Sequence, residues 1–271
     1  MDWIYLSPHL DDAALSCGGL IREQTLAGDR VQIWTIFTGD PPAGELSAFA
    51  EMLHARWKTG RQAYTIRRQE DQQACKILGA ICQHGGFVES IYRLAQSGQL
   101  VHGDRLLNGE GDTVYLYDSD DAIMGSVDRR ETELIGTLTG WIGARLPEEA
   151  EVVCPLATGN HVDHQIVRMA AEGCGRRLWY YLDYPYILEE MGKVTEISGL
   201  GWQERRFPVS ERGLQGWQAA IEAYGSQLSS FWDSEEELRE AIATYASLFR
   251  PAGNTAPGGV ALFRPTERTN L

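Results

Sequence analysis

Basic residues are scarce in this sequence, and they form no cluster. Lysine and arginine number 24 against 38 aspartates and glutamates, which gives the 271 residues a formal net charge of -14. A chain of this charge without a basic patch repels a phosphate backbone. We therefore expect no nucleic acid among its partners.

The 5 cysteines are odd in number and include no C-x-x-C pair. That spacing argues against a disulfide framework and gives no sign of a thiolate metal site. We expect Cys17, Cys75, Cys82, Cys154 and Cys174 to be small buried hydrophobic residues in a reducing compartment.

Long apolar runs and a basic leader are also missing. The first residues, MDWIYLSPHLDD, carry acid early, and no stretch is apolar for long enough to span a bilayer. Hydrophobic residues still make up 43% of the chain, which is an ordinary balance for a globular protein. We expect a cytoplasmic protein with no integral membrane association.

Strand and helix patterns alternate from the start of the chain. Residues 3–6 form a short apolar run, residues 13–27 repeat apolar side chains at helical spacing, and residues 31–37 are β-branched and aromatic. The later elements that we expect are helices at 66–78, 129–146 and 164–173 and strands at 151–156 and 178–182. This order predicts an α/β, Rossmann-like three-layer fold, with a mostly parallel sheet flanked by helices.

We expect one domain over residues 1–271, with two additions to the alternating pattern. Residues 85–128 are rich in Gly, Asp and Ser around a strand candidate at 113–117, which predicts an irregular insertion near a site. Helical patterns at 214–228 and 235–249 predict a helical C-terminal extension at about 210–250. The insertion, with Tyr184 and Tyr186, is expected to cap a pocket.

Two polar runs follow predicted strands. PHLDD (8–12) comes after the first strand, and HVDH (161–164) comes after the strand at 151–156. The carboxyl ends of parallel strands form the ligand crevice in open α/β sheets. Both runs are therefore expected to face one crevice at this edge.

These runs offer the donors of a hydrolytic metal site. His9, Asp12 and His164 would supply three ligands to Zn²⁺, or to another divalent transition metal, and leave a position open for water. Asp11 would remain beside the metal as a general base, and His161 could stabilise an oxyanion.

Structural roles compete with these assignments. Asp11 or Asp12 could instead cap the following helix. Arg67 is expected to form an exposed helical ion pair with Glu70 or Asp71 rather than to bind substrate. Aromatic residues beside strands usually belong to the core, as we expect for Trp217 and as an alternative for Tyr184 and Tyr186. Histidines outside the two runs are expected to be solvated or structural: His54, His84 and His102.

Several motifs together resemble those of the PIG-L/LmbE-like zinc N-deacetylases. PHLDD is followed by CGG (17–19), TGD (38–40) and RRQE (67–70), and HVDH comes later. The resemblance implies a hydrolase that removes an N-acetyl group from an amino-sugar-containing small molecule, such as an N-acetylglucosamine derivative or glycoside. It also implies zinc ligation by His9, Asp12 and His164, with Asp11 as general base and His161 as second catalytic histidine.

Three other functions were weighed against this one. A nucleotide-binding module is disfavoured because SCGG (16–19) is neither G-x-G-x-x-G nor a P-loop. A metal-dependent amidase acting on a non-sugar N-acyl compound stays an alternative, as does a binding protein with a vestigial metal site. The exact substrate and the oligomeric state, including a homo-oligomer, are left open by the sequence.

Overall fold

The computed structural model describes residues 1–44, 46–94, 101–102, 105–106, 115–117, 119–199 and 201–266. Its strands are β1 (Asp2–Ser7), β2 (Arg30–Phe37), β3 (Ile81–Phe87), β4 (Val101–His102), β5 (Arg105–Leu106), β6 (Glu151–Pro155), β7 (Leu178–Tyr181), β8 (Trp202–Val209) and β9 (Gly258–Pro265). Its α-helices are α1 (Asp12–Leu26), α2 (Ala48–Trp57), α3 (Ala63–Leu78), α4 (Ser119–Met124), α5 (Thr132–Gly143), α6 (Val162–Gly173), α7 (Met191–Gly199), α8 (Glu211–Glu222) and α9 (Glu235–Leu248). Short 3₁₀ helices are η1 (Gly60–Gln62), η2 (Ser90–Tyr92), η3 (Arg129–Glu131), η4 (Tyr186–Glu190) and η5 (Leu228–Ser230).

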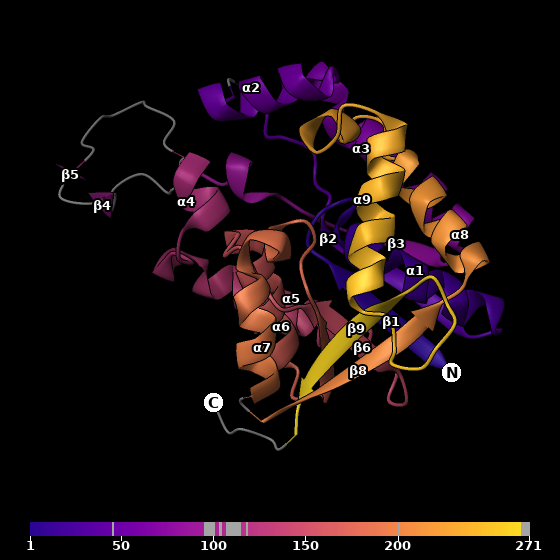
Figure 1. Cartoon of the computed structure of the whole chain (residues 1–271). Helices are drawn as coiled ribbons and strands as arrows, with labels where there is room; N and C mark the ends of the chain where they lie inside the picture. The colour runs from indigo at the N-terminus through magenta and orange to yellow at the C-terminus, as the bar shows by residue number, and fades with distance from the viewer. Residues whose placement is uncertain are drawn as a thin grey trace.

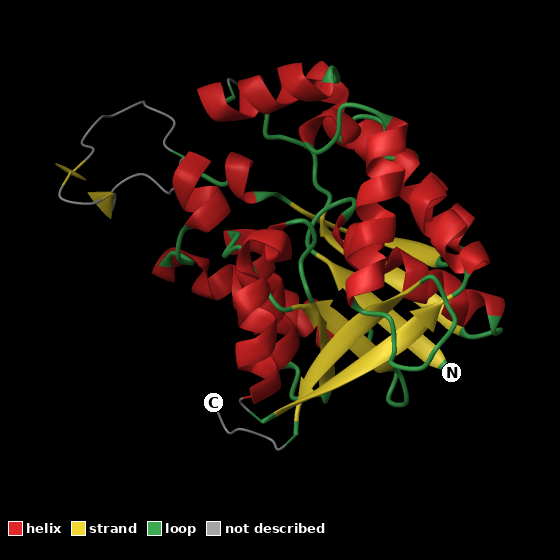
Figure 2. Ribbon diagram, viewed as in Figure 1, coloured by secondary structure: helices red, strands yellow, loops and turns green. Residues whose placement is uncertain are grey.

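A seven-stranded sheet runs through the molecule in the order β3-β2-β1-β6-β7-β9-β8 (Figures 1 and 2). The strands from β3 to β7 pair in parallel, and β9 pairs antiparallel with both β7 and β8. Helices α1, α3, α8 and α9 contact one another on one face, whereas α5 and α6 pack together on the other. The mostly parallel, three-layer α/β arrangement expected from the sequence is confirmed.

The predicted strands match β1, β2, β6 and β7, but β3, β8 and β9 of the large sheet were not predicted. Strand β3 (ICQHGGF) contains two glycines and is only partly buried. Strand β8 (WQERRFPV) is an edge strand that alternates exposed polar and half-buried residues. Strand β9 (GGVALFRP) is mostly buried, and its sequence does not alternate polar with apolar residues. These strands are defined by pairing with neighbours distant in sequence, which a local pattern does not report.

The expected insertion at 85–128 is only partly described, whereas the expected extension at 210–250 is described throughout. The candidate strand 113–117 lies partly outside the described residues, and Tyr115 forms an isolated antiparallel bridge with Leu94. Helices α8 and α9 form within 210–250 as expected, and Trp217 and Tyr245 on them belong to the main hydrophobic core. Treating the whole chain as one domain stays a prediction.

The core sits on both sides of the central strands. Side chains of β1, β2, β6 and β7 are almost wholly buried, and Trp217 reaches them from α8. Burying each large apolar side chain contributes about 1.5–3 kcal/mol. The carboxyl ends of these strands are therefore held on a rigid base. None of the helices in the described ranges combines the length and apolar character that crossing a membrane requires.

Candidate functional site

The two polar runs meet where the sheet reverses its winding. From β1 the chain winds outward through β2 to β3, and it later returns to β6 on the other side of β1. The carboxyl ends of β1 and β6 thus form the topological switch point at which open α/β sheets bind ligands. The loop after β1 carries His9, and the loop after β6 carries His161, as the sequence predicts.

A serine shapes the first loop. The Ser7 hydroxyl accepts the backbone N–H of Ala13 at 3.0 Å and donates to the carbonyl of His9 at 2.7 Å. Asp11 occupies the N-cap position of α1 but makes no capping hydrogen bond, and Asp12 instead accepts the N–H of His9 at 2.7 Å. The alternative that these carboxylates serve as helix caps is therefore wrong, and both remain available for chemistry.

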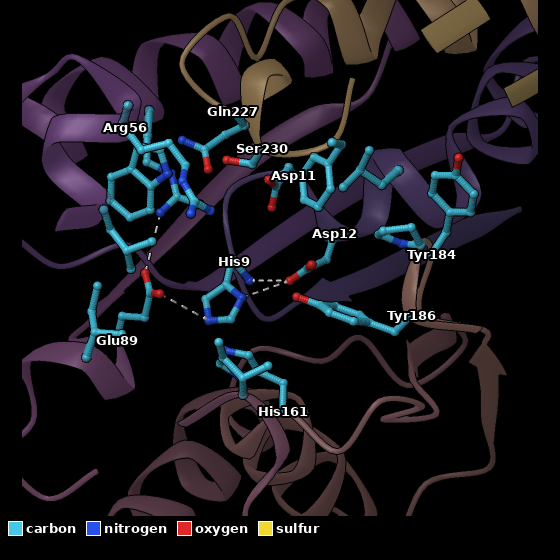
Figure 3. A pocket seen from close by; sticks show the side chains of 18 of the residues that line it. His9, Asp11, Asp12, Arg56, Glu89, His161, Tyr184, Tyr186, Gln227 and Ser230 are labelled. Atoms are coloured by element: carbon cyan, nitrogen blue, oxygen red, sulfur yellow. Dashed lines mark hydrogen bonds and ion pairs between the residues drawn. The ribbon is translucent and has the colours of Figure 1, made fainter. Parts of the chain in front are cut away.

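Three donor atoms converge at the centre of this loop pair. Asp12 Oδ2 lies 3.3 Å from His9 Nδ1 and 3.3 Å from His164 Nε2. The latter nitrogen is buried, and none of the described residues forms a hydrogen bond with it. Donors at these separations can close around one ion at bonds of about 2.0–2.2 Å. His9 and Asp12 face each other in Figure 3, with His161 below them.

Each of the two histidines is held by a carboxylate on its other ring nitrogen. His9 Nε2 lies 2.9 Å from Asp163 Oδ2, and His164 Nδ1 lies 2.7 Å from Asp183 Oδ1. Such carboxylates fix the tautomer and orientation of metal-binding histidines. Burial would raise the pKa of Asp163, but Arg93 and His9 hold it well below its usual range. The donor set and its supports therefore fit a divalent transition metal.

His161 begins α6 and uses one ring nitrogen locally. Its Nδ1 accepts the backbone N–H of Asp163 at 3.2 Å. Burial, and then the charges of His9 and His164, lower the pKa of His161 well below its usual value. A neutral ring that accepts at Nδ1 carries its proton on Nε2. His161 can therefore donate a hydrogen bond into the pocket that it lines.

His161 is also an alternative ligand. Ring nitrogens of His9, His161 and His164 all lie within 4.8 Å of one another. The geometry alone thus allows a three-histidine group as well as the set with Asp12.

Asp11 differs from its neighbour Asp12 in the hydrogen bonding of its carboxylate. In the part of the chain that the structure describes, no group donates a hydrogen bond to its carboxylate, which lines the pocket (Figure 3). Burial and the charge of Asp12 raise the pKa of Asp11 to about 6. A carboxylate in this setting can accept a proton near neutral pH.

The pocket above these residues has walls from four parts of the chain. The described residues of the expected insertion contribute Glu89, Ile91 and Ile123, and Tyr184 and Tyr186 line it as expected. The sequence did not indicate the remaining walls, which are Phe49, Leu53, Arg56 and Trp57 of α2 and Gln227, Ser230 and Phe231 around η5. Aromatic and aliphatic side chains therefore line the pocket together with hydrogen-bonding groups, and Gln227 and Ser230 lie near Asp11 (Figure 3).

The interpretation of Arg67 as an exposed helical ion pair is wrong. Its side chain is only 4% exposed, and its guanidinium lies 3.5 Å from Glu89 and 4.7 Å from the centre of the Trp57 ring. Glu70 and Asp71 bind other partners, Ser226 and Tyr224 among them. Arg67 therefore belongs to the pocket, where its charge faces the acidic centre.

Three supporting carboxylates were given no role from the sequence. Asp163 lies between the two histidines of the HVDH motif, so its position could have indicated a role at the site. Asp183 lies in the aromatic segment after β7, and only the parallel pairing of β7 with β6 brings it to His164. Glu89 lies 3.8 Å from His9, and burial raises its pKa to about 7. No local motif marks Glu89.

Comparisons with known proteins place this chain among deacetylase families by sequence similarity. The sequence model of the PIG-L family, described as GlcNAc-PI de-N-acetylase, matches residues 4–174. A 2'-N-acetylparomamine deacetylase of Streptomyces fradiae is 29% identical over 189 residues, which are 68% of this chain and 57% of that relative. The enzyme of the same name from Niallia circulans is 23% identical over 262 residues, covering 88% of this chain and 84% of its own.

A solved structure resembles the whole chain. The zinc-inhibited form of teicoplanin deacetylase superimposes with a TM-score of 0.74 and 25% identity, over 97% of each chain. The likeness thus extends through α8, α9 and the antiparallel strands, beyond the residues that the family model matches.

Proposed function

The chain belongs to the PIG-L family, and on that basis we propose that it is a metal-dependent N-deacetylase of acetylated amino sugars. The observation that carries the proposal is the convergence of Asp12 Oδ2 on His9 Nδ1 and His164 Nε2, 3.3 Å from each, beside the unpaired carboxylate of Asp11. A metal centre with a free base in a closed pocket is suited to amide hydrolysis. The names of the relatives support an N-acetyl amide as the bond that is cleaved and an acetylated amino sugar as the substrate.

We assign His9, Asp12 and His164 as the metal ligands. Asp12 is preferred to His161 because its Oδ2 lies 3.3 Å from each of the other two donors. Zn²⁺ bound there would polarise the acyl carbonyl and lower the pKa of water.

The reaction then relies on two side chains. Asp11 accepts the proton of the attacking water, since no other group occupies its carboxylate, and it returns a proton to the leaving amine. His161 donates Nε2–H to the oxygen of the tetrahedral oxyanion. A neutral imidazole can serve as this donor, so the lowered pKa of His161 does not oppose the role.

The rim of the pocket is suited to a sugar. Arg56, Gln227 and Ser230 offer donors for hydroxyl groups, and Trp57 presents a ring of the kind that packs on a sugar face.

The test pairs a substrate panel with two carboxylate variants. Zinc-loaded protein is assayed for acetate and free amine released from N-acetylated amino sugars, beside simple N-acyl amides without a sugar. Asp11→Asn is expected to keep its zinc and to lose about a hundredfold or more in kcat, while Asp12→Asn loses zinc.

Three results would contradict parts of this proposal. If amine were released only from the non-sugar amides, the proposed substrate class would be wrong, but the proposed amide hydrolysis would stand. If Asp12→Asn kept its zinc while His161→Ala lost it, the three-histidine group would be the ligand set. No turnover of any amide by fully zinc-loaded protein would favour a binding protein.

A further inference from the structure

A second group of metal-binding side chains lies between α3 and β3, away from the pocket. Asp71 and Cys75 are one turn apart on α3, and Cys82 and His84 alternate along β3, so each pair shares one face of its element. Gly79, with φ 78°, ends the helix and allows the tight turn between them. None of the four lines the substrate pocket.

Three of the four side chains, Asp71, Cys82 and His84, are in direct contact, and Cys75 lies close to Asp71 and Cys82. Cys82 Sγ lies 3.4 Å from Asp71 Oδ2 and 3.2 Å from His84 Nε2, and these last two atoms lie 2.9 Å apart. The donors of Asp71, Cys75 and Cys82 all lie within 4.8 Å of one another. Bonds of about 2.0–2.3 Å in a tetrahedron separate ligand atoms by similar distances.

The carboxylate of Asp71 is oriented by groups outside the cluster. Tyr224 donates its hydroxyl to Oδ1 at 2.7 Å, and Thr35 donates to Oδ2 at 3.2 Å. Oδ2 is thereby turned toward Cys82 and His84. Metal-binding carboxylates are usually held in this way by hydrogen bonds from a surrounding shell.

We propose that Asp71, Cys75, Cys82 and His84 form a second, structural metal site that binds Zn²⁺. Thiolate and imidazole donors select zinc over harder ions, and four protein donors complete a tetrahedron without an open position. The burial of Asp71 and Cys75 also suits a closed site, and His84, whose side chain is 17% exposed, gives the ion a route of entry. Each thiol gives up its proton to solvent as its sulfur binds the ion.

The spacing D-x₃-C-x₆-C-x-H contains no C-x-x-C pair, so a search for that motif does not detect a thiolate site here. The ion would connect α3 to β3, and β3 is the edge strand of the large sheet. Its place in the fold therefore argues for a role in holding that edge.

Cobalt distinguishes this site from the catalytic centre. Protein freed of metal by a chelator, and kept reduced, is titrated with Co²⁺ while its near-ultraviolet and visible absorption is recorded. Only a site with thiolate ligands gives sulfur-to-cobalt charge-transfer absorption, and the ligands proposed for the catalytic centre include no sulfur. We expect this absorption in the wild type and in His164→Ala, and its loss in Cys82→Ser.

Zinc content gives an independent readout. We expect about two equivalents per chain in the wild type and about one in Cys75→Ser or in Cys82→Ser. Cys174→Ser is the matched control, because Cys174 is half-buried against α5 and should leave both the zinc content and the cobalt spectrum unchanged.

The wild-type spectrum decides the matter even if a variant fails to fold. Cobalt binding without charge-transfer absorption would overturn the proposal. Charge-transfer absorption that persisted in folded Cys82→Ser would overturn it as well. A disulfide between Cys75 and Cys82 in protein isolated under reducing conditions, with one zinc per chain, would also overturn it. None of these outcomes depends on deacetylase activity.

Discussion

At the scale of single residues, Asp183 shows how the metal centre is held in place. Its Oδ2 accepts the backbone N–H of Thr158 at 2.8 Å, and its Oδ1 lies 2.7 Å from His164 Nδ1. The carboxylate is almost wholly buried, so it ties the loop after β6 to the end of β7. His164 is thereby fixed with Nε2 directed at Asp12.

We expect Asp183→Asn to weaken zinc binding by about 10–100-fold. The amide keeps the shape of the carboxylate but loses its charge, so the histidine becomes a poorer donor. Competition with a chromophoric chelator measures the affinity. Glu190→Gln is the control, since Glu190 holds the neighbouring Gly159 N–H without touching a histidine. An unchanged zinc affinity in Asp183→Asn would show that Asp183 does not position His164 for metal binding.

At the scale of elements, the glycines of the CGG motif allow two helices to pack closely. A Cβ atom on Gly18 would lie 2.4 Å from Trp217 Cδ1, and one on Gly19 would lie 2.6 Å from its Cε3. The Trp217 indole also donates to the carbonyl of Ala14 at 2.7 Å. The motif therefore brings α8 against α1, directly behind the loop that carries Asp11.

We expect Gly18→Ala to lower the free energy of unfolding by about 1–2 kcal/mol. Alanine favours a helix by about 1 kcal/mol, but overpacking against a buried indole costs about 1–3 kcal/mol or more. Gly136→Ala in α5 is the matched control, because nothing lies within 4 Å of the added atom. Denaturant unfolding of both variants measures the contrast, and equal stabilisation of both would show that the helices can move apart.

The start of α5 offers a test of pH dependence. Asp128 caps η3 by accepting the N–H of Arg130 at 2.8 Å, and its Oδ2 pairs with the guanidinium at 2.6 Å. The side-chain hydrogen bond from Arg130 lowers the pKa of Asp128. A lowered pKa stabilises the folded chain above the unfolded value of about 4, and this contribution is lost as the pH falls through the folded value.

Asp128→Asn should therefore cost about 0.5 kcal/mol at pH 7 and almost nothing near pH 2, because the pair is partly exposed and screened by solvent. Thermal unfolding of wild type and variant across this range measures the difference. Arg130→Gln should flatten the same dependence. A penalty that persisted unchanged at pH 2 would mean that the cap, and not the charge, carries the effect.

Local patterns were sufficient for some elements and not for others. Strands β1 and β2 are apolar, and α1 ends just before Gly28, so their own residues define them. Strand β8 exposes charged residues on one side and is a strand because β9 pairs with it along its length. The same distinction separates the site residues. His9 and His164 lie in compact motifs, whereas Asp183, Glu89 and the walls from α2 reach the pocket only through the tertiary fold.

At the scale of the whole molecule, the net charge of -14 sets the field that a substrate meets. If the substrate carries a free amine, this field should raise its association rate, and salt should weaken the effect. We expect kcat/KM for such a substrate to fall by about threefold or more when the ionic strength is raised tenfold. A neutral acetylated sugar assayed in parallel should change little. Equal salt effects on both substrates would show that the net charge does not speed the association of the cationic substrate.

The position of the metal donors in the chain has a consequence for folding. His9 and its partner Asp163 are 154 residues apart. His9 follows β1 and Asp163 lies in α6, which follows β6, and these two strands become neighbours only once the chain has crossed from one half of the sheet to the other. Closing so long a loop costs entropy before any contact is gained. A bound ion therefore links the loop after β1 to α6 only after the sheet has formed. It cannot help the first half of the chain to fold while the second half is still being synthesised.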